Sequence, residues 1–213
     1  MLKGIIFDFD GVIAESVQVK IDAFAMLYNQ YGPEIVKKVV EHHETNGGMS
    51  RFEKIKFYHE SFLNKTIPEK EITDLANQFS DFVVEKIIAA PFVPGALEYI
   101  QKSYEQVKLF ISTGTPTEEM QRILEKKNIA HYFTAVFGSP EKKTVHVNNI
   151  ISKYKLSPDE MLFIGDSNSD MDAAFFHSVP FVLRLHTLNQ NHLLHYTGQT
   201  IINFNNFNTE YFK

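Results

Sequence analysis

Near its beginning the chain reads Gly4-Ile5-Ile6-Phe7-Asp8-Phe9-Asp10-Gly11-Val12. This run is short, apolar and β-branched, and it ends in acids, so it predicts a buried strand with carboxylates at its carboxyl end. In an open parallel sheet, ligands bind beyond the carboxyl ends of the strands. We therefore expect Asp8 and Asp10 to lie in a functional site.

The chain after Pro91 and Pro94-Gly95 alternates between strand-like and helix-like apolar patterns. The patterns predict strands over residues 107–112, 135–137, 161–164 and 181–185, and a last edge strand over 200–204. They predict helices over residues 96–102, 117–127, 145–153 and 171–177. Strands that alternate with helices of about ten residues are typical of parallel βαβ units. The expected fold class is therefore α/β, with a Rossmann-like parallel sheet that includes the first strand.

The segment over residues 16–90 has a different pattern, because its apolar side chains recur at helical spacing. Breaks at Gly32-Pro33, Asn46-Gly47-Gly48 and Ile67-Pro68 divide it into about four or five helices. We expect a core domain made of residues 1–15 and 91–213, with a helical domain of residues 16–90 inserted after the first strand.

The composition excludes several functions. The 213 residues include 21 Lys and Arg against 26 Asp and Glu, a formal net charge of −5, which gives no general reason to bind nucleic acid or an acidic membrane surface. Without cysteine, the chain has no disulfides, thiolate metal sites or thiol catalysis. No apolar run approaches the roughly 18 residues of a membrane span, and no cleavage site follows the first residues. We expect a cytoplasmic protein without nucleic-acid or membrane partners; no oligomeric state is predicted.

The residues that follow each predicted strand make up the expected site. They are Asp8 and Asp10, then Thr113 and Gly114, then Lys142 and Lys143, and finally Asp166 and Asp170. Four carboxylates in one pocket repel one another unless a cation joins them, and ligation by oxygen alone favours Mg²⁺. A lysine and a hydroxyl beside such a metal suit a transferring phosphoryl group. The residues therefore predict Mg²⁺-dependent phosphoryl transfer, in which one of Asp8 and Asp10 attacks phosphorus while the other acts as acid and base.

Two motifs identify a family. Asp8-Phe9-Asp10-Gly11-Val12 after an apolar strand, together with Gly165-Asp166-Ser167-x-x-Asp170 far downstream, resembles the motifs of the haloacid dehalogenase (HAD) superfamily hydrolases. The insertion over residues 16–90 resembles the helical C1-type cap of its phosphoglycolate phosphatase and β-phosphoglucomutase-like members. The resemblance covers essentially the whole chain and implies a HAD-like α/β core with an inserted α-helical cap.

The resemblance implies roles for the four acids. Asp8 is expected to be the nucleophile and a metal ligand. Asp10 is expected to be the acid and base, and to lend its backbone carbonyl to the metal. Asp166 is expected to bind the metal directly, and Asp170 to complete or orient the metal's shell.

It also implies roles for the residues that hold the phosphoryl group. Thr113 is expected to hydrogen-bond to it, and Gly114 to offer its backbone N–H. A lysine is expected to neutralise the nucleophile and the phosphate. Lys142 and Lys143 are both candidates, and the spacing from Gly138-Ser139-Pro140 favours Lys143.

The acid at position 10 narrows the activity that the resemblance implies. Dehalogenases and phosphonatases of the superfamily lack an acid two residues after the nucleophile, so Asp10 points to phosphate esters. We expect a phosphatase that acts on a small phosphorylated metabolite through an aspartyl-phosphate on Asp8. A β-phosphoglucomutase-like phosphomutase and a catalytically weak phospho-binding regulatory protein are the alternatives. A receiver-type signalling domain would be shorter, about 120 residues, and without the insertion.

The cap contributes three further expectations. Its loop Asn46-Gly47-Gly48-Met49-Ser50-Arg51 resembles the specificity loop of β-phosphoglucomutase, so Arg51 is a candidate for binding a substrate anion, or it lies on an exposed first turn of a helix. The mutases carry a histidine where this chain has Lys20, a departure that favours hydrolysis. Adjacent His42 and His43 point about 100° apart on a helix and lack a third ligand, so we expect them at the surface.

Overall fold

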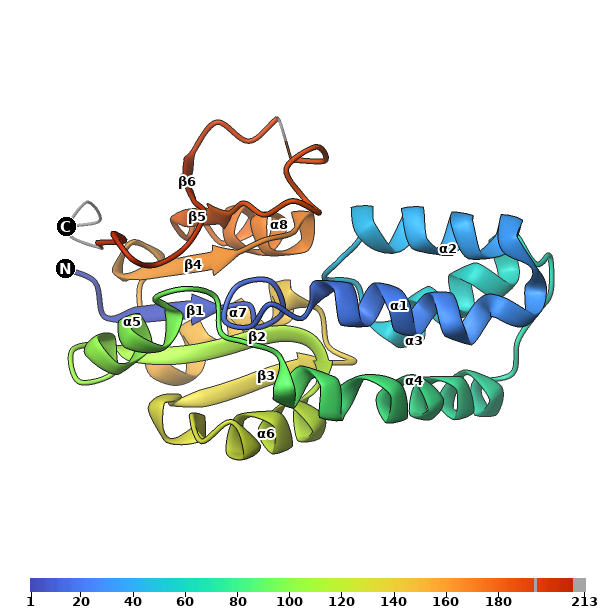
Figure 1. The fold of residues 1–213 in the computed structure, drawn as a ribbon. Helices are drawn as coiled ribbons and strands as arrows, with labels where there is room; N and C mark the ends of the chain where they lie inside the picture. The colour runs from blue at the N-terminus through green and yellow to red at the C-terminus, as the bar shows by residue number, and fades with distance from the viewer. Residues whose placement is uncertain (194, 209–213) are drawn as a thin grey trace.

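Six parallel strands form one sheet in the order β3-β2-β1-β4-β5-β6 (Figure 1). The computed structural model describes residues 1–193 and 195–208. The strands are β1 (Gly4–Phe7), β2 (Lys108–Pro116), β3 (Ala135–Ser139), β4 (Met161–Gly165), β5 (Phe181–Arg184) and β6 (Gln199–Ile201). Along the chain, β2 and β3 are added on one side of β1, and β4, β5 and β6 are then added on its other side. The direction in which strands are added changes between β1 and β4, so the carboxyl ends of these two strands border a crevice.

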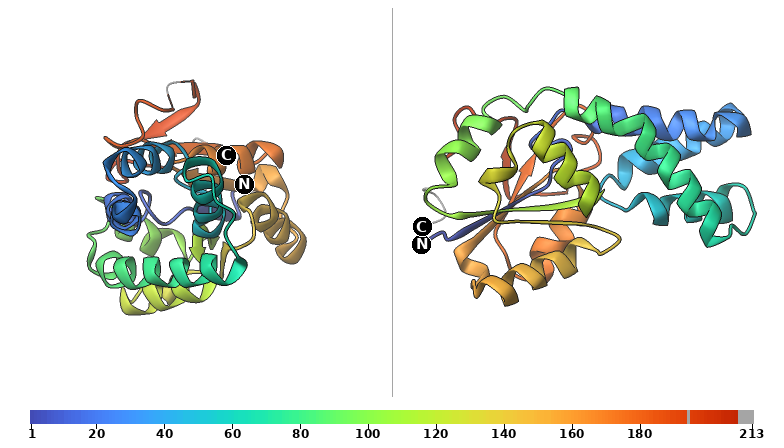
Figure 2. Two further views of the ribbon diagram at one scale, coloured as in Figure 1. Left: turned by 90° about the vertical axis from the view of Figure 1, so that its right-hand side faces the viewer. Right: turned by 90° about the horizontal axis from the view of Figure 1, so that it is seen from below.

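The apolar run around Ile6 forms β1, and both faces of this strand are covered. It pairs with β2 on one side and with β4 on the other. Its alternating side chains enter two separate cores: Ile5 and Phe7 belong to one, and Ile6 to the other. The first core includes residues of α5 (Ala96–Ser103) and α6 (Thr117–Lys126), and the second includes residues of α7 (Lys143–Tyr154) and α8 (Asn168–Phe176) (Figure 2). A strand buried on both faces is apolar throughout.

The helical cap lies between β1 and α5 in the chain and extends beyond the carboxyl ends of the strands (Figure 1). It consists of α1 (Val17–Tyr28), α2 (Pro33–Thr45), α3 (Arg51–Phe57) and α4 (Glu69–Ala89), with a π-helical turn over Tyr58–Phe62. Phe24 of α1 packs against Tyr58 and Phe79, with ring centroids 5.7 and 4.4 Å apart. The apolar side chains at helical spacing therefore face one another and give the cap an aromatic core of its own.

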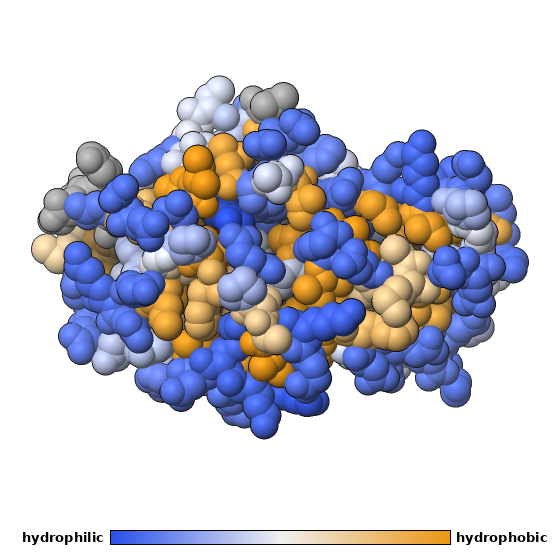
Figure 3. All heavy atoms as spheres, viewed as in Figure 1, coloured by the Kyte–Doolittle hydropathy of each residue, from blue (hydrophilic) through white to orange (hydrophobic). Residues whose placement is uncertain are grey.

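The expected α/β fold with an inserted helical cap is confirmed. The observed elements differ from the expected ones mainly at their ends: α8 begins at Asn168 rather than at residue 171, because Ser167 and Asp170 form a capping box at its start. The last strand is the sheet edge, as expected, but covers Gln199–Ile201. Hydrophilic residues cover most of the face in Figure 3, and apolar ones gather between core and cap. Among the helices described, none has the length and apolar character that crossing a membrane requires.

Candidate active site

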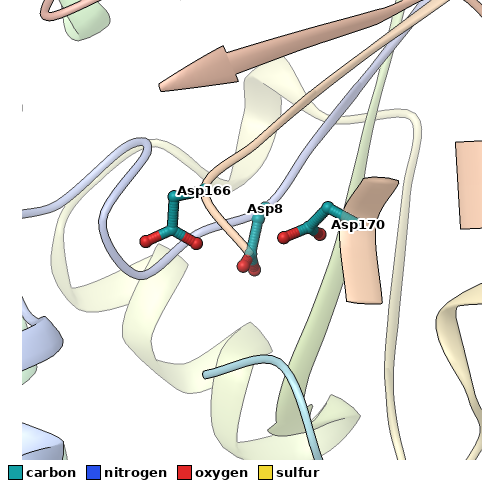
Figure 4. A group of neighbouring side chains, drawn as sticks. All are labelled: Asp8, Asp166 and Asp170. Carbon is teal, nitrogen blue, oxygen red and sulfur yellow. The ribbon is translucent and has the colours of Figure 1, made fainter. Parts of the chain in front are cut away.

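Three buried aspartates meet at the carboxyl ends of β1 and β4. Asp8 follows β1, while Asp166 and Asp170 follow β4, and one carboxylate oxygen from each lies within 4.8 Å of the other two. Figure 4 shows Asp8 between Asp166 and Asp170. Because β1 and β4 are neighbours in the sheet, two motifs that are far apart in the sequence converge on one point.

Local sequence explains why the two loops approach so closely. Gly11 has a φ of +75°, which favours glycine, and a Cβ at this position would collide with the carboxylate of Asp166. Asp170 is held by the first turn of α8: its Oδ2 accepts hydrogen bonds from the Ser167 backbone N–H at 3.1 Å and from the Ser167 hydroxyl at 2.5 Å. Asp170 is thus oriented before any ligand binds.

Lys143, at the start of α7, joins this group. Its Nζ lies 2.8 Å from Asp8 Oδ2 and 2.6 Å from Asp170 Oδ1. Burial acts against its charge, but Asp170 and Asp8 outweigh burial and hold the pKa of Lys143 above its ordinary value. Lys142, the other candidate, is exposed. The geometry therefore brings Lys143, and not its neighbour, to the expected position.

The charges of this group fit a divalent cation. Burial raises the pKa of Asp8 to about 7, with Lys143 opposing and Asp170 and Asp10 adding to the rise. Burial also raises the pKa of Asp166, although the hydrogen bond from His186 lowers it in part. Burial likewise raises the pKa of Asp170, although Lys143 lowers it in part. Lys143 contacts two of the three buried carboxylates, and no lysine or arginine of the described residues pairs with the third, Asp166, so acidic groups are in excess. Their oxygens are the donors that Mg²⁺ prefers.

Asp10 has a different environment from Asp8, although the two acids are only two residues apart. Its carboxylate accepts hydrogen bonds from the Ser16 hydroxyl at 2.6 Å and from Lys20 Nζ at 2.5 Å. Lys20, on cap helix α1, also donates to the Thr115 hydroxyl at 2.9 Å. Burial favours the neutral acid, but Lys20 and Ser16 outweigh it and hold the pKa of Asp10 below its usual range. The sequence marked Lys20 as a departure from the mutases and as a hinge residue of more structural than catalytic character, and did not reveal its contact with Asp10.

Thr113 and Gly114 lie where the pairing of β2 with β3 slips, between Ser112 and Pro116. Both residues line the cavity that contains Asp8, and the Thr113 side chain is buried there. Thr113 Oγ1 accepts a hydrogen bond from the Thr115 backbone N–H at 3.2 Å. The irregular backbone thus brings the expected hydroxyl and the expected glycine into the acid site.

The cap loop borders this cavity. A Cβ on Gly114 would lie only 3.0 Å from the Gly48 carbonyl oxygen, and a Cβ on Gly48 would collide with the Ser169 hydroxyl. The glycines therefore permit direct backbone contact between cap and core. Gly47 and Gly48 line the cavity from the cap, opposite Asp8 and Asp166 from the core.

Arg51 does not lie on an exposed first turn, which was one of the two expectations, and its other expected role, binding a substrate anion, stays a prediction. Its guanidinium is buried and binds Glu119 of core helix α6 with two hydrogen bonds, of 2.6 and 3.0 Å. It also donates to the Ser80 hydroxyl at 2.5 Å and lies 4.7 Å from the centre of the Phe79 ring. In this arrangement Arg51 joins cap to core, and a substrate anion would have to displace Glu119 to reach it.

His186 is a site residue that the sequence did not reveal. Its Nδ1 accepts the Leu188 backbone N–H at 3.2 Å, so Nε2 carries the proton and donates to Asp166 Oδ2 at 2.9 Å. Asn189 adds a hydrogen bond to the Asp166 carbonyl at 2.8 Å. The loop after β5 therefore fixes one oxygen of Asp166 and leaves the other for a ligand. No spacing between histidines marked His186.

The expectation that His42 and His43 lie at the surface is wrong for His43, which is only 3% exposed. Its Nδ1 lies 2.7 Å from Nζ of Lys54, a buried lysine on α3. Burial, followed by the charge on Lys54, holds the pKa of His43 well below its ordinary value. Because α2 packs against the rest of the cap, the two adjacent histidines face different surroundings.

Comparison with known proteins adds to this geometry. The sequence model of the family of haloacid dehalogenase-like hydrolases matches residues 5–183 of this chain. The phosphorylated carbohydrates phosphatase of Thermotoga maritima is 25% identical over 81% of this chain and 80% of its own. The phosphoglycolate phosphatase of Vibrio cholerae is 37% identical, over 31% of each protein. The crystal structure of β-phosphoglucomutase from Clostridium difficile superposes with a TM-score of 0.77 at 20% identity, over 99% of this chain and 95% of that one.

Proposed function

Because this chain belongs to the haloacid dehalogenase-like hydrolases, we propose that it is a Mg²⁺-dependent phosphatase of small phosphorylated metabolites, with Asp8 as the nucleophile. Relatives that carry the names phosphoglycolate phosphatase and phosphorylated carbohydrates phosphatase support this activity. The observation that carries the proposal is that two neighbouring acids have different environments. Asp8 faces Lys143 and two other carboxylates, whereas Asp10 is held by Lys20 and Ser16. Two carboxylates in different environments suit two different roles.

The metal would be held by Asp8, Asp166 and Asp170, the last of which also orients Lys143. Bound there, Mg²⁺ supplies positive charge that offsets the carboxylates and the phosphate. His186 keeps Asp166 in place through its Nε2–H. Lys143 adds a fixed ammonium beside the nucleophilic oxygens, and Thr113 adds a hydroxyl for the phosphoryl oxygens.

The residues of the chain perform the reaction in two steps. In the first, an Asp8 oxygen forms a bond to phosphorus while the ester P–O bond breaks, and Asp10, in the fraction of molecules in which it is protonated, gives its proton to the leaving oxygen. In the second, Asp10 takes a proton from water, whose oxygen attacks phosphorus and releases phosphate from Asp8. Lys20 stabilises the carboxylate form of Asp10, which is the form that activates water.

The test is an incubation of the purified protein with Mg²⁺ and a panel of phosphorylated sugars and phosphorylated hydroxy acids. Free phosphate and isomerised products are both measured. We expect phosphate release, and a loss of at least about a thousandfold in Asp8→Asn, since the nucleophile is removed. Asp22→Asn, which changes an exposed acid on α1, is the matched control and should retain activity.

Isomerised sugar phosphates without free phosphate would replace the phosphatase with a phosphomutase. Unchanged activity in Asp8→Asn would overturn the mechanism. Binding of phosphorylated compounds without turnover of any of them would favour a regulatory protein.

A further inference from the structure

Four lysine and arginine side chains are buried in the part of the chain that the structure describes, and one of them differs from the rest. Arg51 pairs with Glu119, Lys143 with Asp8 and Asp170, and Arg184 with Glu15. Lys54, at 1% exposure, has no carboxylate within ion-pair distance among residues 1–193 and 195–208. A buried charge without a counter-charge is costly, so its presence calls for an explanation.

The surroundings of Lys54 do not compensate for its charge. Its Nζ lies 2.7 Å from the Nδ1 atom of His43 and 5.6 Å from the centre of the Phe24 ring. Burial, followed by the charges of Lys20 and Lys143, holds the pKa of Lys54 well below its ordinary value. A bound anion would favour the charged form of Lys54.

This site opens on the cavity that contains the acids. Lys54 and Arg51 line a hollow at the cap–core boundary. Lys20, His43, Gly47 and Gly114 line both this hollow and the larger cavity around Asp8. Lys54 thus lies on the cap side of a hollow that borders the cavity around the nucleophile.

We infer that Lys54 and His43 form a cap subsite for a second anionic group of the substrate, a carboxylate or a second phosphate on the molecule whose first phosphate meets Asp8. The inference rests on the proposed function for the placement of that first phosphate. Of the basic residues that line the hollow, Arg51 is engaged by Glu119 and Lys20 by Asp10, so Lys54 remains for the distal anion. The preferred substrates are then small phosphomonoesters with an anion at each end.

The test measures binding of three phosphonates, which the phosphatase reaction does not cleave, by calorimetry in the presence of Mg²⁺. Propylphosphonate has one anionic end, 3-phosphonopropionate adds a carboxylate, and propane-1,3-bisphosphonate adds a second phosphonate. We expect the protein to bind at least one of the last two about tenfold or more tightly than propylphosphonate, as a charge-assisted contact allows. Which of the two binds more tightly distinguishes a carboxylate from a phosphate.

Lys54→Met should remove this preference and leave propylphosphonate binding unchanged. Lys56→Met is the matched control, because Lys56 is exposed on the same helix and should keep the preference. Lys54→Gln replaces the first variant if circular dichroism shows that Lys54→Met does not fold.

Equal binding of all three ligands to the unchanged protein would overturn the inference, as would a preference that persists without Lys54. Because no turnover is measured, this result is independent of the phosphate-release assay. Phosphate release with equal phosphonate binding would reject the subsite alone, and absence of phosphate release would reject the proposed function alone.

Discussion

Lys143 and Lys54 are both buried lysines that face the space between core and cap, but their environments are opposite. Lys143 contacts two carboxylates, which hold its pKa high, whereas Lys54 contacts His43 and an aromatic ring, and its pKa is held low. The core half of the site therefore contains its own counter-charges and is ordered without a ligand. In the cap half, no carboxylate of the described residues pairs with Lys54.

This difference separates two tasks of the site. Asp170 and Lys143 are fixed by α8 and α7, so the group that performs the chemistry is preorganised. Lys54 belongs to the cap, where a lysine without a carboxylate partner favours anionic ligands over neutral and cationic ones. Reaction type would then be determined by the core and substrate choice by the cap.

The largest effect is expected from Lys143→Met, which removes the compensation on the core side. Asp8 and Asp170 would then lack their lysine, so we expect a loss of about 3–5 kcal/mol in the free energy of unfolding of the metal-free protein. Turnover should fall by about a hundred- to a thousandfold. Urea unfolding and phosphate release measure the two effects.

Lys142→Met is the matched control, since Lys142 is exposed next to Lys143. It should leave stability and turnover unchanged. If Lys143→Met were as stable as the unchanged metal-free protein, the acids would not depend on this lysine, and the contrast between the two halves of the site would be lost.

The fold and the acids of the site follow from local patterns in the sequence. The apolar run around Ile6 identifies the central strand, because a strand with helices on both faces has no polar side. Asp8 and Asp166 come together because parallel strands end at the same edge of the sheet. Position after a strand was therefore enough to place Asp8, Thr113, Lys143 and Asp166 in one cavity or in contact with its acids.

Other contacts depend on tertiary packing and leave no local pattern. Arg51 meets Glu119, which is 68 positions away, so its partner is decided by how the cap docks on α6. His43 and Lys54 come from different cap helices. His186 comes from an irregular loop after β5. A lone histidine or lysine carries no periodicity, and for this reason the cap half of the site was predicted least well.

His186→Ala should lower the affinity for Mg²⁺ about 10- to 100-fold, since an outer residue that orients a metal ligand is lost. This variant tests whether hydrogen bonds within the core half hold Asp166 in place. Calorimetric titration with Mg²⁺, without substrate, is the measurement. His195→Ala, in the same loop and with its side chain exposed, is the control. Unchanged Mg²⁺ affinity would show that Asp166 needs no such support.

The acids of the core also predict a pH dependence. The pKa of Asp8 is raised from 3.8 to about 7, so between these values the folded metal-free protein holds a proton that the unfolded chain releases. Stability from this group is therefore lost as the pH rises toward 7 and changes little above it. We expect the melting temperature of the metal-free protein, relative to Asp8→Asn, to fall from pH 5 to pH 7. A relative rise over this range would contradict the assigned charge state.

The smallest effect, and the sharpest contrast with Lys143, is expected for stability in Lys54→Met. Methionine fills similar space without a charge, so the variant should gain about 1 kcal/mol in the free energy of unfolding at pH 7. The folded-state pKa of Lys54 is depressed, so its cost is greatest at low pH and disappears as the pH rises toward the pKa of the unfolded chain. The gain, measured by urea unfolding, should therefore shrink between pH 7 and pH 10. A loss of stability comparable to that of Lys143→Met would mean that Lys54 is compensated within the protein, and the two halves of the site would then be alike.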